Sequence, residues 1–130
     1  MARRHVLVVE DEQPTLTLLE KTLTAAGYRV TGVLDGMAAL KAARGDPPDL
    51  VLLDLIMPGV DGYGVCALLK RDSTFRAPIA ILTGRTSEKD AKAAFEAGAD
   101  AVLHKPIDRQ DLLARITELL TGRASSGGQT

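Results

Sequence analysis

Leu50-Val51-Leu52-Leu53-Asp54 is an apolar run that ends in a carboxylate, and residues 55–62 follow it with the sequence LIMPGVDG. The apolar run predicts a buried strand, and the proline and glycines after it predict a tight loop. Ligands of open α/β folds bind beyond the carboxyl ends of the strands. Asp54 is therefore expected at the mouth of a sheet, and it is the leading candidate for the chemical centre of the protein.

The composition is that of one globular domain. The chain has 130 residues, of which 45% are hydrophobic and 25% charged, with a net charge of −1; this is enough for one core and too little for two domains. The near-zero charge gives no support for direct nucleic-acid binding by this domain. The apolar run at residues 6–9 is interrupted by Glu10 and is too short for a secretion signal or a membrane span, so a cytoplasmic protein without membrane association is expected.

Apolar runs alternate with segments of helical spacing along the whole chain. Strands are expected at residues 6–9, 28–34, 50–54, 79–83 and 101–103. Helices are expected at residues 14–26, 36–45, 62–72, 88–98 and 109–121. The run at 28–34 is more polar than the others, which indicates an edge strand. Asp35 and Asp108 are expected to cap their helices, Phe95 to lie in the core, and His5 to lie at the surface or at the rim of the sheet.

This alternation predicts the fold. Five strand–helix units indicate an α/β protein with a parallel sheet and helices on both faces. Right-handed crossovers leave few topologies, and the doubly wound, flavodoxin-like order 2-1-3-4-5 places the two most apolar strands side by side.

Four of the five expected strands deliver a polar or charged group to the same edge of the sheet. These groups are Glu10, Asp11, Asp54, Thr83 and Lys105. Clustered carboxylates raise one another's pKa values, and a hard cation such as Mg²⁺, which prefers oxygen ligands, relieves that repulsion. The lysine and the hydroxyl can bind a phosphoryl group, and the central aspartate can act as a nucleophile that forms an acyl phosphate.

Each of these residues also has an ordinary structural interpretation. An aspartate after a strand is commonly a turn residue or a helix cap, and a threonine at a strand end commonly reflects β-propensity. The ordered occurrence of such groups on four strands is what favours a functional site.

The motifs resemble the receiver domain of bacterial two-component response regulators, of the chemotaxis-regulator type. The matching pieces are VVEDE at 8–12, DLIMPGVDG at 54–62, LTG at 82–84 and KP at 105–106. The likeness covers about residues 5–121, so residues 1–121 are expected to form the receiver domain and residues 122–130 a flexible tail or the start of a linker.

The resemblance implies a role for each residue at the sheet edge. Asp54 corresponds to the phosphoacceptor of a phosphorelay. Glu10 and Asp11 correspond to the acid pair that holds Mg²⁺ together with Asp54, and the backbone carbonyl of Ile56 is a further ligand.

The resemblance also implies a signalling output and partners. Thr83 corresponds to the switch hydroxyl and Lys105 to the lysine that contacts the phosphate. The implied partners are a sensor histidine kinase or a histidine phosphotransfer domain, a downstream effector, and a second copy in a phosphorylation-dependent dimer. The domain would be no enzyme beyond its own phosphorylation and dephosphorylation. Val102 stands where many receivers have an aromatic ring that reports the switch.

Two alternatives remain open from the sequence. Val102 is compatible with a degenerate receiver that acts as a phosphorylation-independent interaction module. An aspartate-nucleophile phosphatase is less favoured, because such enzymes need a second acid two residues after the nucleophile, where this chain has Ile56.

Overall fold

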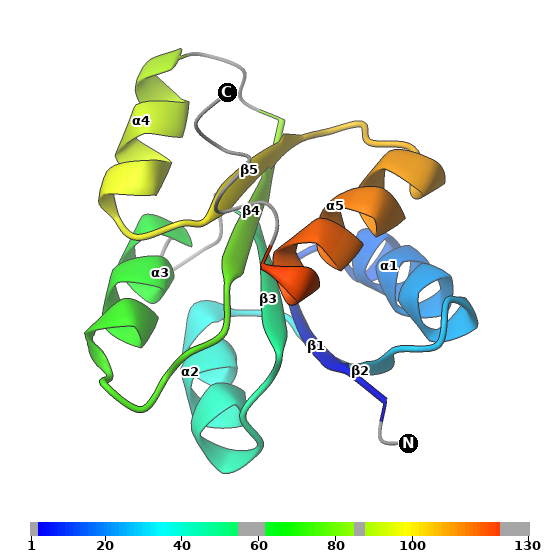
Figure 1. The fold of residues 1–130 in the computed structure, drawn as a ribbon, viewed down its shortest axis with the longest axis horizontal. Helices are drawn as coiled ribbons and strands as arrows, with labels where there is room; N and C mark the ends of the chain where they lie inside the picture. The colour runs from blue at the N-terminus through cyan, green and yellow to red at the C-terminus, as the bar shows by residue number, and fades with distance from the viewer. Residues whose placement is uncertain (1–2, 55–61, 85–87, 123–130) are drawn as a thin grey trace.

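The computed structural model describes residues 3–54, 62–84 and 88–122, which form a parallel sheet between two layers of helices (Figure 1). The strand order is β2-β1-β3-β4-β5, which confirms the predicted topology. The elements are β1 (His5–Val9), α1 (Gln13–Ala25), β2 (Arg29–Val33), α2 (Gly36–Gly45), β3 (Leu50–Asp54), α3 (Gly62–Arg71), β4 (Ile79–Thr83), α4 (Glu88–Glu96), β5 (Ala101–His104) and α5 (Arg109–Thr121).

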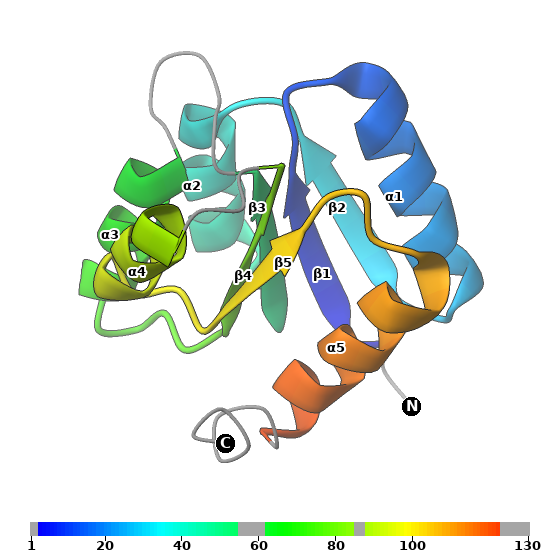
Figure 2. The same cartoon turned by 90° about the horizontal axis from the view of Figure 1, so that it is seen from above.

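The sheet is buried on both faces. Figure 2 shows α1 and α5 on one side of it and α2, α3 and α4 on the other. Side chains alternate along each strand, so Leu7 and Val51 join the core under α2–α4, whereas Val8 and Leu52 join the core under α1 and α5. This arrangement explains why the central strands are continuous apolar runs in the sequence. β2 lies at an edge and is only partly buried, as its composition predicts.

The helix ends follow the predicted signals. The side chain of Asp35 accepts a hydrogen bond from the Ala38 N–H at 2.7 Å, and Asp108 accepts one from the Asp111 N–H at 2.8 Å. Both predicted caps are thereby confirmed. None of the helices in the described parts of the chain is long and apolar enough to cross a membrane.

Two predictions about single residues are wrong. Phe95 is 51% exposed, because the buried residue of α4 is Ala94 and one further residue rotates the side chain by about 100° around the helix. His5 is only 3% exposed. It lies at the start of an inner strand, where its N–H donates to Asp49 Oδ2 at 2.7 Å and its Nε2 lies 2.7 Å from Thr31 Oγ1.

Candidate functional site

The topology brings Asp54 next to two acids from the neighbouring strand. Asp54 is the last residue of β3, and its side chain is 12% exposed. Glu10 directly follows β1, which pairs with β3, and it is fixed by a 3.1 Å hydrogen bond from its N–H to the Val33 carbonyl. Glu10 is almost fully buried and Asp11 is partly buried. A nearly buried Asp54 that still reaches the surface is accessible to a small reagent.

The three carboxylates form one cluster. Glu10, Asp11 and Asp54 each offer an oxygen atom within 4.8 Å of the others. Burial raises the pKa of Asp54 to about 7, and the charge of Glu10 and the hydrogen bond and charge of Asp11 act in the same direction, against the opposing effect of Lys105. The cluster is therefore electrostatically unfavourable on its own and would be stabilised by a cation.

Within the described residues, the positive charge at this site comes from Lys105. It follows β5, and its Nζ lies 2.8 Å from Glu10 Oε1 and 3.8 Å from Asp54 Oδ1. Burial lowers the pKa of Lys105, but the hydrogen bond to Glu10 and the charges of Asp54 and Glu10 outweigh that effect, so the net pKa is raised. The ammonium group is thus held in its charged form between two of the three acids.

Thr83, Val102 and Ile56 are the other residues to which the resemblance gives a role. Thr83 ends β4, is 3% exposed, and accepts a 2.7 Å hydrogen bond at its carbonyl from the Lys105 N–H. Its backbone therefore ties β4 to the segment that carries the lysine. Val102 is half-buried against the core beneath α2–α4. The predicted carbonyl ligand at Ile56 lies outside the described residues.

The sequence does not predict one interaction of the site, the ion pair between Glu10 and Lys105. The resemblance implies a phosphate as the partner of Lys105 and a metal ion as the partner of Glu10, but the structure pairs the two residues with each other. A buried carboxylate needs an opposite charge or several hydrogen bonds. The position of Glu10 directly after an apolar strand was therefore the sequence signal that could have predicted a charged partner.

The donor set fits a hard cation. The cluster in the described residues consists of carboxylate oxygens alone, which suits Mg²⁺ or Ca²⁺ better than a metal that prefers nitrogen or sulfur. Mg²⁺ commonly keeps several waters and binds one or two carboxylates. Glu10, Asp11 and Asp54 can supply that number of ligands without further residues.

Replacing Asp54 with asparagine should stabilise the domain in the absence of metal. The substitution removes a carboxyl group whose charged form is disfavoured by burial and by the neighbouring acids, and we expect the free energy of unfolding at neutral pH to rise by about 1–2 kcal/mol. Urea unfolding in the presence of a chelator measures this change.

A matched acid outside the cluster is the control. Glu96 is exposed on α4, and Glu96→Gln should change the free energy of unfolding by less than about 0.5 kcal/mol. Adding Mg²⁺ should stabilise the wild type more than Asp54→Asn. Equal stabilities of wild type and Asp54→Asn in chelator would show that the cluster carries no repulsion.

Comparisons with known proteins show which family the sequence matches. The family described as "Response regulator receiver domain" matches residues 6–117. The chain is 44% identical over 116 residues to the response regulator PleD of Caulobacter vibrioides, covering 88% of this chain and 26% of that protein. It is 38% identical over 128 residues to the transcriptional regulatory protein CseB of Streptomyces coelicolor, covering 97% of this chain and 54% of CseB. The chain thus spans between about a quarter and about half of these relatives.

Solved structures show the same fold. The Vibrio cholerae chemotaxis protein CheY4 is 29% identical, with a TM-score of 0.87 over 91% of this chain and 99% of that one. The receiver domain of the sensor histidine kinase PA1611 from Pseudomonas aeruginosa is 31% identical, with a TM-score of 0.86 over 92% of this chain and 99% of that one. The PA1611 structure has a magnesium ion coordinated in its active-site cleft.

Proposed function

Because the chain belongs to the receiver-domain family of two-component response regulators, we propose that it is a signalling domain switched by Mg²⁺-dependent phosphorylation of Asp54. The observation that carries the proposal is the meeting of three carboxylates and one ammonium group at the carboxyl edge of the sheet. Asp54 is the member of the cluster that ends a central strand and lies within 4 Å of the lysine.

The proposed chemistry is transfer of a phosphoryl group to Asp54. A carboxylate oxygen of Asp54 bonds to phosphorus while the bond from phosphorus to the donor's leaving atom breaks, which gives an acyl phosphate. Glu10 and Asp11 would hold Mg²⁺ together with Asp54, and the carbonyl of Ile56 is a further proposed ligand. When bound, the ion neutralises charge on the phosphoryl oxygens.

Lys105 and Thr83 would bind the new phosphate. Lys105 Nζ is already 2.8 Å from Glu10 and 3.8 Å from Asp54, so a small movement exchanges one acid for the other. A phosphate on Asp54 carries more charge than the carboxylate and would draw the ammonium group toward it. The Thr83 hydroxyl, at the end of the adjacent strand β4, would donate a hydrogen bond to the same phosphate.

The proposed phosphodonor is a sensor histidine kinase or a histidine phosphotransfer domain. An apolar hollow beside the site is lined by Leu18 of α1 and by Lys105 and Ile107, and Leu18 is 64% exposed. This surface supports donor docking over Asp54, because a donor seated there lies next to the lysine. A downstream effector and a phosphorylation-dependent dimer complete the proposed partners, with residues 1–121 as the receiver domain and 122–130 as a tail or linker.

The test is direct phosphorylation. Wild type and Asp54→Asn are incubated with acetyl phosphate, with Mg²⁺ or with a chelator, and their intact masses are measured. We expect one phosphoryl adduct on the wild type in Mg²⁺ and none in chelator or on the variant. Sedimentation of the same samples measures dimer formation.

The other outcomes identify the alternatives. An unmodified wild type would favour the degenerate receiver, for which Val102 is the supporting residue. Release of phosphate over many turnovers would identify a phosphatase. An adduct that persists on Asp54→Asn would place the phosphoacceptor at another residue.

A further inference from the structure

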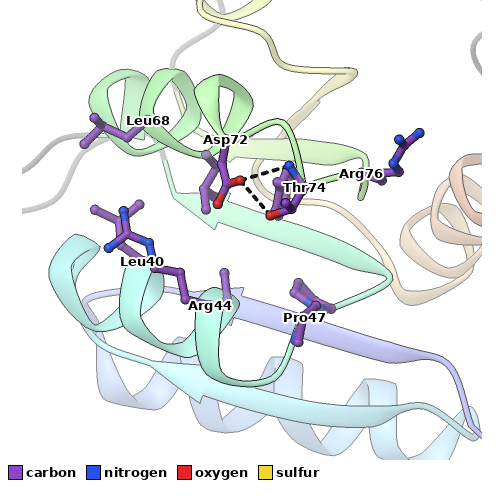
Figure 3. Close-up of a pocket in the computed structure, with 11 residues that line it drawn as sticks. Leu40, Arg44, Pro47, Leu68, Asp72, Thr74 and Arg76 are labelled. Atoms are coloured by element: carbon purple, nitrogen blue, oxygen red, sulfur yellow. Dashed lines mark hydrogen bonds between the residues drawn. The ribbon is translucent and has the colours of Figure 1, made fainter.

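A groove lies between α2 and α3 on the face of the sheet away from α1 and α5 (Figure 3). Its floor and walls include Leu40 from α2, Pro47 from the following loop, and Leu68 and Leu69 from α3. We call it the α2–α3 groove. Its volume is about 130 Å³, well below the roughly 300–1,000 Å³ of sites that enclose small molecules. The groove by itself is therefore too small to enclose a ligand of that kind.

The apolar surface extends along α2 beyond the groove. A second hollow shares Leu40 and Arg44 with the groove and reaches Met37 near the start of the helix. Met37 is 65% exposed and Leu68 is 43% exposed, so both present apolar surface to solvent. The combined surface follows the ten residues of α2, a length of about 15 Å, or nearly three helical turns.

The charges around this surface are unbalanced. Lys41 and Arg44 line the hollow along α2, and Arg76 lies at the far margin of the groove. All three side chains are exposed, and within the described ranges none forms a hydrogen bond or an ion pair. Lys41 and Arg76 are therefore available to a partner, whereas the charge of Arg44 also acts on Asp72, whose pKa it lowers.

The two acids of the same surface are already engaged. Asp35 accepts the capping hydrogen bond from the Ala38 N–H at 2.7 Å. Asp72 accepts hydrogen bonds from the N–H and the hydroxyl of Thr74, at 2.9 and 2.6 Å, shown as dashed lines in Figure 3. Both carboxylates keep their charge, and the hydrogen bonds from Thr74 lower the pKa of Asp72. The surface therefore combines three cations with two anions, and this small positive excess favours a negative partner.

We propose that the α2–α3 groove docks an amphipathic helix of a partner protein, with apolar residues at helical spacing and flanking aspartates or glutamates. Apolar anchors three and four residues apart would contact Met37, Leu40 and Leu68. The flanking acids would pair with Lys41 and Arg44. These ion pairs would fix the orientation of the bound helix and select against helices with basic flanks.

The position of the groove separates this contact from phosphorylation. Pro47 lies before the start of β3, whereas Asp54 is its last residue. The groove is therefore beside the opposite end of the strand from the carboxylate cluster. Met37, at the start of α2, lies nearer the carboxyl edge, because β2 ends there and the Val33 carbonyl accepts a hydrogen bond from the Glu10 N–H. Docking is tested on the unphosphorylated chain and does not rest on the proposed phosphorylation.

The test uses a labelled peptide and the full chain. The probe is a fluorescein-labelled amphipathic helix of about 14 residues, with leucines at helical spacing and glutamates beside them. A matched peptide has lysine in place of each glutamate. Fluorescence anisotropy should show saturable binding of the acidic peptide, at least about tenfold tighter than the basic one and weaker at high salt.

Two variants and one control locate the binding surface. Arg44→Glu and Leu68→Ser change exposed residues of the surface. Each should lower the affinity for the acidic peptide by at least about fivefold. Lys21→Glu removes the same kind of charge from exposed α1 and should change affinity by less than about twofold. Circular dichroism of all three verifies that they are folded.

Three results would overturn the proposal. The first is no saturable binding of the acidic peptide to the wild type. The second is equal binding of both peptides, or equal weakening by Lys21→Glu and Arg44→Glu. The third is self-association of the wild type that Leu68→Ser abolishes, because the groove would then hold a second copy of this chain.

Discussion

Replacing Asp11 with asparagine is expected to weaken Mg²⁺ binding and to slow phosphorylation of Asp54 by about tenfold to a hundredfold, since loss of even an indirect partner of a metal ligand has effects of that size. Asp11 is one of only three acids in the described cluster, and it is less buried than Glu10. Its loss leaves Asp54 and Glu10, and Glu10 is already paired with Lys105 at 2.8 Å, so less negative charge remains to compensate the dehydration of a hard cation. Initial rates of adduct formation with acetyl phosphate, measured over a Mg²⁺ titration, give both quantities.

Glu12 provides a matched control for this experiment. It is an exposed acid one residue further along the chain, and its side chain is outside the cluster. Glu12→Gln should leave the Mg²⁺ dependence within about twofold of the wild type. If Asp11→Asn and Glu12→Gln behaved alike, the acid cluster would not be the metal site.

Replacing Lys105 with methionine should lower the free energy of unfolding by about 2–3 kcal/mol. The ammonium group is the partner of Glu10 at 2.8 Å, and the Glu10 side chain is only 2% exposed. Removing one partner of a buried pair commonly costs about 3–5 kcal/mol, and we reduce that range because the Lys105 side chain is 28% exposed. Urea unfolding in chelator measures the loss.

Two further variants distinguish the lost charge from lost packing. Lys105→Arg keeps the charge and should lose less than about half as much stability. Adding Glu10→Gln to Lys105→Met removes the unpaired carboxylate and should restore at least about 1 kcal/mol. A Lys105→Met protein as stable as the wild type would show that water, rather than the lysine, solvates Glu10.

The sequence predicted the architecture because the relevant signals are local. Apolar strand runs, the caps at Asp35 and Asp108, and the alternation of strands and helices each depend on residues close together in the chain. The candidate site could also be located, since parallel strands in a doubly wound sheet must end at one edge. For this reason Asp54, Glu10 and Asp11 were expected together, and the structure places their oxygens together.

The features that were not predicted depend on the rotation of side chains and on partners far apart in the chain. Helical spacing alone suggested a buried Phe95, but the packing of Ala94 turns that ring to solvent. His5 gave no pattern signal, because its burial follows from two neighbouring strands and from an acid at residue 49. The α2–α3 groove likewise follows from how two helices lie side by side, which spacing within either helix does not specify.

The pairing of Glu10 with Lys105 also has a consequence for how the protein matures. These residues are 95 positions apart, so their contact closes a loop that contains most of the domain. Contacts of such separation form late, because the entropy of closing the loop must first be offset by other interactions. During synthesis, a chain that has emerged only as far as α4 would carry all three acids without their cation. The three acids and their cation can thus come together only after β5 is in place.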